Sequence, residues 1–117
     1  MIPPLTDRQR LHIYRRESLL RDACHRYLAK LDHAQVIKMH GSAFSKAGVP
    51  DTLLVWRGLA VWFEWKVPGG KVSKIQEVRM RRLEHCLSRC FVCSTLGDVE
   101  AALIAIIREG HLQEPPL

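Results

Sequence analysis

Long apolar runs are absent from the sequence: no stretch reaches the roughly 18 residues that a helix needs to cross a membrane. The first residues, 1–7, also lack the basic flank and apolar core of a secretory signal. These two absences predict a protein with no membrane span that works in the cytoplasm.

Cysteine is scarce, and its pattern does not complete a zinc site. Of the four cysteines, Cys90 and Cys93 form a C-x-x-C pair that follows His85 and Cys86 closely. A structural zinc site needs a second ligand pair at a suitable spacing, and Cys24 alone does not supply one. We interpret the cysteines as small core residues that stay reduced in the cytoplasm, with zinc as the less favoured alternative.

Acidic residues are too few to balance the basic ones. Twelve Asp and Glu face eighteen Lys and Arg, which gives a net charge of +6 and a pI near 9.5. A basic chain of this kind is attracted to polyanions, so nucleic acid is the expected partner, and a solvated basic surface is the alternative. The 117 residues fit one domain, 1–117, with a core over about 7–109 and short proline-containing tails.

Apolar periodicity predicts an α/β domain with the element order α-β-β-β-α-β-α. The expected helices are 8–31, 74–89 and 97–108, and the expected strands are 35–40, 51–57, 59–67 and 91–94. Ser73 is the expected N-cap of the middle helix, whose apolar stripe would include Ile75 and Leu87. So few strands favour a small mixed β-sheet flanked by helices.

The third expected strand contains an anomaly, because Glu64 and Lys66 interrupt an aromatic and apolar run. Side chains alternate faces along a strand, so these two residues share a face while Trp65 points to the core. A Glu and a Lys inside a central strand are costly unless a function uses them. An exposed surface ion pair is the alternative interpretation.

A third charged residue is expected beside this pair. Counting back from the turn at Arg57 and Gly58 places Asp51 opposite Glu64 in a hairpin. Two adjacent carboxylates repel, and a divalent cation such as Mg²⁺ removes that penalty. Lys66 could then orient a nucleophile or stabilise negative charge, which suggests metal-assisted hydrolysis of a phosphodiester.

These residues occur in an order that resembles the VRR-NUC branch of the PD-(D/E)xK nuclease superfamily. The matching features are Glu17, 48–51 (GVPD), 63–66 (FEWK), 68–73 (PGGKVS) and Gln76. The resemblance covers about residues 16–105 and includes the small stand-alone viral and bacterial members. Trp65 departs from it, because an aliphatic residue is expected between the Glu and the Lys.

The resemblance implies a restriction-endonuclease-like core and a magnesium site, at which Mn²⁺ is expected to substitute. Asp51 and Glu64 would be metal ligands, with the Trp65 carbonyl as a further ligand. Glu17 would complete the site directly or through water.

The same resemblance implies that Lys66 is the catalytic lysine and that Gln76 lies near the metal or the DNA backbone. The implied activity is a metal-dependent DNA endonuclease that acts on branched DNA as a homodimer, like Holliday junction resolvases. Its expected setting is the cytoplasm of a prokaryotic cell or of a phage-infected host.

Basic residues near this site are candidates for contacts with DNA. Lys71 and Lys74 flank the turn at Gly69 and Gly70, which we call the glycine-rich loop. Arg79 follows on the next helix, and Lys38 could approach from the first strand. For each of them a solvated surface charge is the alternative. Two other functions also stay open: a non-catalytic nucleic-acid-binding module on the same fold, and a protein–protein adaptor with a basic face.

Overall fold

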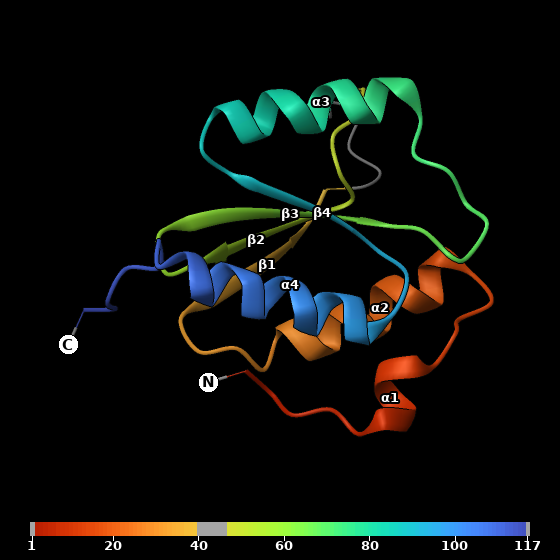
Figure 1. Cartoon of the computed structure of the whole chain (residues 1–117), viewed down its shortest axis with the longest axis horizontal. Coiled ribbons are helices and arrows are strands. Elements are labelled where there is room, and N and C mark those ends of the chain that lie inside the picture. The colour runs from red at the N-terminus through yellow and green to blue at the C-terminus, as the bar shows by residue number, and fades with distance from the viewer. Residues whose placement is uncertain (1, 40–46, 117) are drawn as a thin grey trace.

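A four-stranded mixed sheet forms the centre of the computed structural model, which describes residues 2–39 and 47–116 (Figure 1). The strands are β1 (Ala34–Lys38), β2 (Thr52–Trp56), β3 (Leu59–Trp65) and β4 (Arg89–Cys93). They lie in the order β1-β2-β3-β4. Strand β2 is antiparallel to both of its neighbours, β1 and β3, whereas β4 runs parallel to β3.

Helices cover both faces of this sheet. Figure 1 shows α2 (Glu17–Leu28) and α4 (Leu96–Glu109) on one side and α3 (Lys74–His85) on the other. The short helix α1 (Asp7–Leu11) contacts α4. Among the described residues, no helix is long and apolar enough to span a membrane. The fold is therefore an α/β sheet flanked by helices, as the sequence predicts.

The main core lies between the sheet and the α2–α4 layer. Along β3, Val61, Phe63 and Trp65 are buried on this side, and the last two rings stack with centroids 5.2 Å apart. Trp65 thus points into the core, as expected for the bulky residue between Glu64 and Lys66. The helices contribute Leu20, Cys24, Leu28, Val99, Leu103 and Ile106. Each large apolar side chain buried in this way contributes roughly 1.5–3 kcal/mol.

The predicted hairpin register is confirmed. Trp56 pairs with Leu59 and Thr52 pairs with Phe63. Arg57 and Gly58 connect the strands with φ values of 47° and 84°, the positive angles that a two-residue hairpin turn requires. The other predicted strands shift by one or two residues at their ends, and the end of the predicted strand 35–40 falls partly outside the described residues.

The prediction of one continuous helix over 8–31 is wrong. Helix α1 ends at Leu11, α2 begins at Glu17, and residues 12–16 are not helical. Because α1 packs against α4 while α2 packs against the sheet, the chain has to change direction between them. The apolar spacing continues through this change of direction, so periodicity alone does not reveal it.

The prediction for α3 is right in position and wrong in length and burial. The helix ends at His85 instead of 89, and Arg89 already belongs to β4. The expected apolar stripe is not buried, since Ile75 is 53% exposed and Leu87 is 86% exposed. Among the described elements α3 contacts β4, so most of its surface stays in solvent. The predicted helix 97–108 matches α4 closely.

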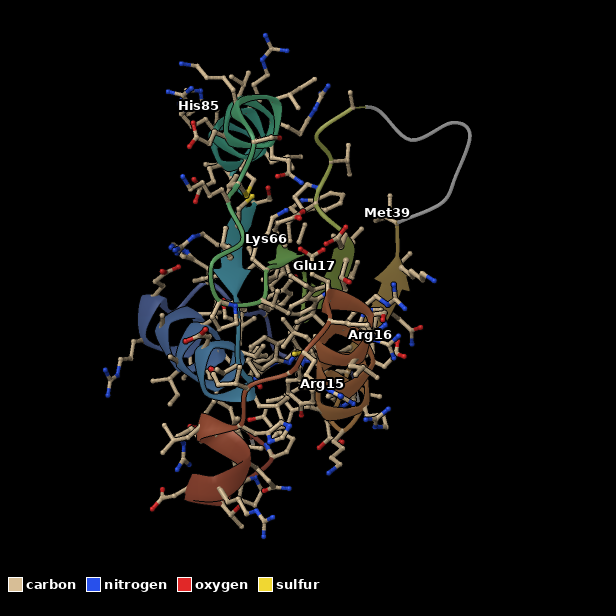
Figure 2. The ribbon with its side chains drawn as sticks, turned by 90° about the vertical axis from the view of Figure 1, so that its right-hand side faces the viewer. Arg15, Arg16, Glu17, Met39, Lys66 and His85 are labelled. Atoms are coloured by element: carbon tan, nitrogen blue, oxygen red, sulfur yellow. The ribbon has the colours of Figure 1, made fainter. Side chains whose placement is uncertain are left out.

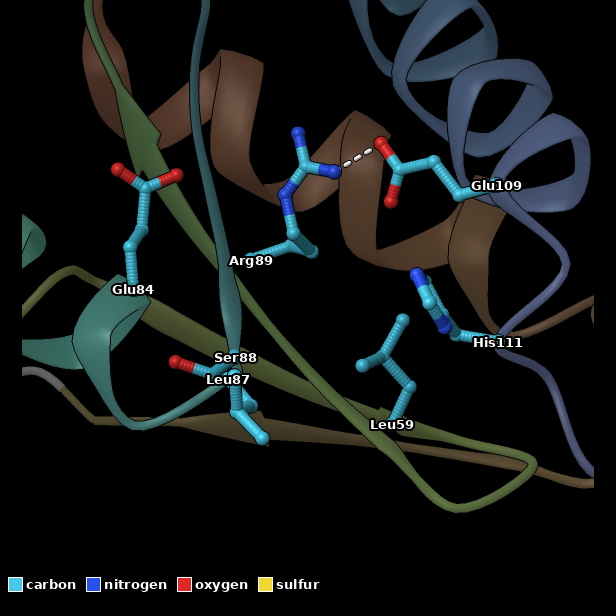
Figure 3. A pocket seen from close by; sticks show the side chains of 7 residues that line it. All are labelled: Leu59, Glu84, Leu87, Ser88, Arg89, Glu109 and His111. Atoms are coloured by element: carbon cyan, nitrogen blue, oxygen red, sulfur yellow. Dashed lines mark hydrogen bonds and ion pairs between the residues drawn. The ribbon is translucent and has the colours of Figure 1, made fainter.

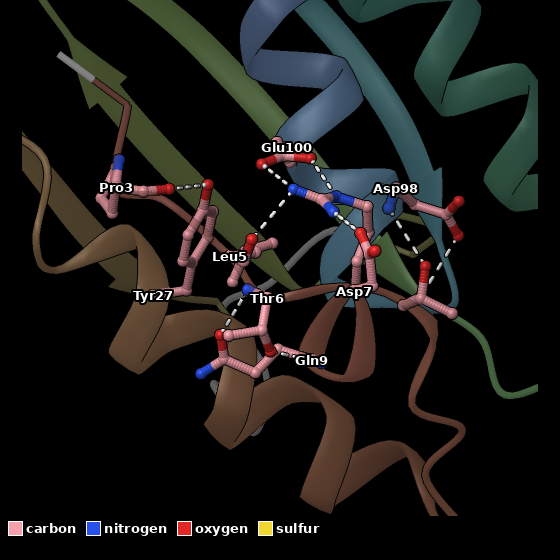
Figure 4. A network of polar contacts seen from close by, with 10 residues as sticks. Pro3, Leu5, Thr6, Asp7, Gln9, Tyr27, Asp98 and Glu100 are labelled. Carbon is pink, nitrogen blue, oxygen red and sulfur yellow. Dashed lines mark hydrogen bonds and ion pairs between the residues drawn. The ribbon is translucent and has the colours of Figure 1, made fainter.

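Helix α1 is fixed to the N-terminal end of α4 by one arginine. The Arg10 guanidinium binds the Glu100 carboxylate at 2.7 Å and also reaches Asp7 and the Leu5 carbonyl, residues that converge in Figure 4. Gly97 lets the two segments approach closely: a Cβ there would lie 2.6 Å from Arg10 Cγ and 2.8 Å from its carbonyl oxygen.

We predict that Gly97→Ala destabilises the protein. Alanine normally favours a helix by up to about 1 kcal/mol over glycine. Here the added methyl group would push against the Arg10 backbone, and such overpacking costs about 1–3 kcal/mol. Urea unfolding measures the difference, with Ala101→Gly on the exposed side of α4 as a control for helix propensity. An unchanged or raised stability of Gly97→Ala would contradict this packing of α1.

Candidate functional site

The predicted carboxylate pair is brought together where β2 begins and β3 ends. Asp51 immediately precedes β2, and Glu64 is the penultimate residue of β3. The backbone N–H of Trp65 donates to the Asp51 carboxylate at 3.3 Å. N–H and C=O groups of one strand residue point to the same side, so the Trp65 carbonyl also faces the Asp51 side.

Glu64 is the most unusual residue of the site, because its side chain is only 2% exposed. Its Oε2 accepts a hydrogen bond from Gln76 at 3.0 Å and lies 3.4 Å from the Lys66 ammonium. Its Oε1 is buried and has no hydrogen-bond partner among the described residues. Burial and the Asp51 carboxylate raise the pKa of Glu64 to about 7, and Lys66 acts in the opposite direction. The exposed ion pair considered from the sequence is therefore wrong for this residue.

Lys66 lies between Glu64 and the first turn of α2. Its Nζ is 3.9 Å from the Glu17 carboxylate, and Figure 2 shows Glu17 and Lys66 on the same face of the molecule. The glycine-rich loop folds back over the lysine stem: a Cβ at Gly70 would lie 3.5 Å from Lys66 Cδ. That distance is an ordinary van der Waals contact, and the tighter neighbour of such a Cβ would be the Val67 carbonyl oxygen at 3.1 Å.

Gln76 connects the site to the start of α3. Its Oε1 accepts from the Ser73 N–H at 2.9 Å, and the Ser73 hydroxyl accepts from the Gln76 N–H, which completes a capping box. Its Nε2 donates to Glu64. The amide is thus fixed at both ends and contacts the predicted metal ligand Glu64, while the expected position of Gln76 near a metal or the DNA backbone stays a prediction.

An open hollow of about 230 Å³ lies beside these residues. It is lined by Glu17, Ser18, Arg21, Asp51 and Trp65. Two carboxylates and one guanidinium therefore border the space that a ligand of the site would enter.

The residues present fit a small hard cation, with two carboxylates as its protein ligands. Among the described residues, no cluster of three or more His, Cys, Asp or Glu side chains is arranged to hold a metal. Mg²⁺ needs only one or two carboxylates, with water and phosphate oxygens completing its shell. The buried Glu64 Oε1 beside Asp51 is the atom that a cation would satisfy. Glu17 contacts Lys66, and its role as a ligand stays a prediction.

The predicted DNA-binding residues differ in their surroundings. Lys71 and Lys74 are exposed next to the glycine-rich loop. Arg79 donates to the Ala47 carbonyl at 3.4 Å, so it supports the segment that leads to Asp51. Lys38 is exposed on β1 and pairs with Thr52, which pairs with Phe63. Its side chain therefore lies on the opposite face of the sheet from that of Glu64. Contacts of all four with DNA stay predictions.

A buried polar network beneath the site was missed by the sequence analysis. Thr52 is fully buried, and its hydroxyl accepts from the Trp65 indole N–H at 2.9 Å and lies 2.7 Å from His25 Nε2. Because the hydroxyl oxygen accepts from Trp65, its proton is available to His25, whose ring then accepts at Nε2. Burial and the nearby Arg21 lower the pKa of His25, which favours this neutral ring. The four-residue spacing of Glu17, Arg21 and His25 on α2 was the available signal.

Cys24 lies on α2, Cys86 follows α3, and Cys90 and Cys93 lie on β4, where Cys93 pairs with Trp65. Cys24 and Cys93 are buried, Cys90 is partly buried, and Cys86 is exposed, so the interpretation as core residues is wrong for Cys86. Burial raises the pKa of the Cys24 and Cys90 thiols to about 12.

A larger hollow of about 530 Å³ lies at the opposite ends of β3 and β4 (Figure 3). Leu59, Leu87 and His111 line it together with the ion pair between Arg89 and Glu109. It is separate from the carboxylate pair, since Leu59 begins β3 and Glu64 lies near the other end of that strand.

Comparison of the chain with protein-family models, with curated proteins and with solved structures finds no match.

We predict that Glu64 makes the metal-free protein more stable as the pH falls from about 8 to 5, whereas His25, whose pKa is lowered by burial, acts in the opposite direction. Glu64 has a pKa near 7 when folded and an ordinary value near 4.5 when unfolded, so within this window the folded state binds more protons. Glu64→Gln should raise the stability at pH 8 and remove the Glu64 contribution to the pH dependence. Urea unfolding in chelator across this range measures both effects. Equal pH profiles for the two proteins would show that Glu64 does not titrate in this way.

The two contacts of Gln76 can be separated by substitution. Gln76→Glu keeps the capping box, because glutamate also closes one, but it replaces the donor to Glu64 with a negative charge. We expect unchanged helix content and a further increase in the pKa of Glu64, measured by carboxyl NMR titration. Gln76→Ala loses both contacts and should also weaken the start of α3. A Glu64 pKa that is the same in wild type and Gln76→Glu would argue against the contact.

Proposed function

We propose that the protein is a magnesium-dependent DNA endonuclease with a restriction-endonuclease-like core of the VRR-NUC type. The single observation that carries this proposal is the pairing of Asp51 with a buried Glu64, with Lys66 at 3.4 Å on the same side. A buried carboxylate beside a second carboxylate is destabilising unless a cation joins them. The sheet contains the antiparallel β2–β3 hairpin and the parallel strand β4, and helix α3 connects β3 to β4. This arrangement is consistent with the restriction-endonuclease-like core that the sequence motifs suggest.

Asp51 and Glu64 would hold Mg²⁺, with the Trp65 carbonyl as a third ligand and Mn²⁺ as a substitute ion. When bound, the metal supplies a water of lowered pKa and positive charge for phosphate oxygens. The Asp51 carboxylate is held by the Trp65 N–H, and the Glu64 carboxylate is held by Gln76. Both ligands are therefore positioned before the ion arrives.

Lys66 would contact the scissile phosphate or the attacking water. Its ammonium is anchored near Glu64 and Glu17, and it can donate to an oxygen that gains negative charge during hydrolysis. Glu17 lies at the open side of the site, where it can orient Lys66 or a water molecule. Gln76 acts as a positioning residue, because its contact is with the Glu64 carboxylate.

The proposed substrate is branched DNA, cut by a homodimer. The net charge of +6 suits a polyanion, and Lys71 and Lys74 are exposed beside the site. A domain of 117 residues is too small to surround a DNA junction alone. A two-fold dimer would offer two sites to two strands, which symmetric resolution of a junction requires.

We predict that the purified protein with Mg²⁺ or Mn²⁺ nicks four-way junctions or flaps faster than plain duplex. Asp51→Ala, Glu64→Ala and Lys66→Ala should each lower cleavage by roughly 100-fold or more, while binding changes little. Gel assays of cleavage, with binding measured in parallel, give both quantities. A variant that cuts at the wild-type rate would contradict the site. Tight binding without cleavage by the wild type would favour a non-catalytic module.

A further inference from the structure

Residues 12–16, His-Ile-Tyr-Arg-Arg, form a loop that interrupts the first helical region. We call this segment the aromatic–arginine loop. Both of its ends are fixed: α1 is bound to α4 through Arg10 and the close contact at Gly97, and α2 begins at Glu17. Since Glu17 contacts Lys66, the loop ends one residue before the candidate active site.

The arginines of this loop face solvent on the same side as the site. Figure 2 shows Arg15, Arg16, Glu17 and Lys66 on one face of the molecule. Arg15 and Arg16 are exposed, and neither side chain forms an ion pair or hydrogen bond with the described residues. Arginines of this kind are suited to phosphate contacts, because the guanidinium matches the geometry of phosphate oxygens.

A hollow of about 530 Å³ lies between the loop and the outer side of α2. His12, Ile13 and Tyr14 line it from the loop, and Leu19 and Arg26 line it from α2. Asp22 also borders it, but its carboxylate is paired with Arg21 at 3.1 Å. The hollow therefore combines apolar and aromatic walls with a surplus of positive charge.

The apolar part of the hollow is preformed and partly uncovered. The His12 and Tyr14 rings meet edge to face with centroids 4.5 Å apart, and Ile13 between them is 55% exposed. Aromatic and apolar surfaces of this kind bind the faces of nucleobases, with arginines on the neighbouring phosphates. In a continuous duplex these faces are covered by stacking, whereas an unpaired strand exposes them.

We infer that the aromatic–arginine loop binds the unpaired DNA strand next to the cleavage position, with bases on His12 and Ile13 and phosphates on Arg15 and Arg16. This inference rests on the proposed function, and it names the substrate feature that the site selects. Branched DNA with a single-stranded region beside the cut is then preferred over continuous duplex.

The test measures binding in chelator, so that it does not depend on catalysis. The probes are a fluorescent oligothymidine of about 12 nucleotides and a hairpin duplex, compared by anisotropy. His12→Ala/Ile13→Ala should weaken oligothymidine binding about 5- to 100-fold, as expected for lost base stacking, and leave duplex binding nearly unchanged. Arg15→Ala/Arg16→Ala should weaken binding of both probes and reduce its salt dependence.

Lys30→Ala/Arg108→Ala is the matched control, because it removes two exposed charges elsewhere. Tyr14 is kept in all variants, since it packs against the core, and the single variant Ile13→Ala replaces the double variant if that one fails to fold. Oligothymidine binding that is equal in wild type and both loop variants, or reduced as much in the control, would overturn the inference.

Cleavage assays on the same proteins separate the two proposals. If the wild type cuts branched DNA but the loop variants bind oligothymidine normally, the inference fails and the nuclease proposal stands. If no protein cuts DNA but oligothymidine binding depends on the loop, the nuclease proposal fails, and only the binding of an unpaired strand by the loop is supported.

Discussion

The burial of one carboxylate, that of Glu64, is the constraint on which the rest of the site depends. An ionised carboxylate in the interior is costly unless opposite charge or hydrogen bonds compensate it. Gln76 and Lys66 compensate one oxygen, while the other remains without a partner among the described residues. Asp51 makes the environment more negative, which raises the pKa of Glu64 to about 7. The ionised form of Glu64 is therefore disfavoured in the metal-free site, and a bound cation would favour it.

The fold places each of these groups through a local feature of the backbone. The two-residue turn at Arg57 and Gly58 sets the register that brings Asp51 to the end of β3. The capping box at Ser73 starts α3 at the point where Gln76 reaches Glu64. The glycine-rich loop between these elements passes close to the Lys66 side chain at Gly70. Stability and the proposed chemistry thus share residues at one end of the sheet.

The parts of this arrangement that follow from short-range rules could be predicted from the sequence. Hairpin counting put Asp51 near Glu64, and strand alternation put Lys66 on the same side and Trp65 in the core. The break at residues 12–16 could not be predicted, because it depends on the docking of Arg10 on Glu100, far away in the sequence. The exposure of α3 and the Thr52–His25 contact likewise depend on how whole elements pack. Long-range packing leaves little trace in a local pattern.

The central claim is that Asp51 and Glu64 together form a cation site, and calorimetric titration with Mn²⁺ at pH 8 tests it most directly. At this pH Glu64 is mostly ionised, so proton competition is small. The account predicts that the wild type binds one Mn²⁺ per chain, that Mg²⁺ competes with it, and that Asp51→Asn and Glu64→Gln abolish binding. The absence of binding by the wild type, or equal binding by the two variants, would contradict the account.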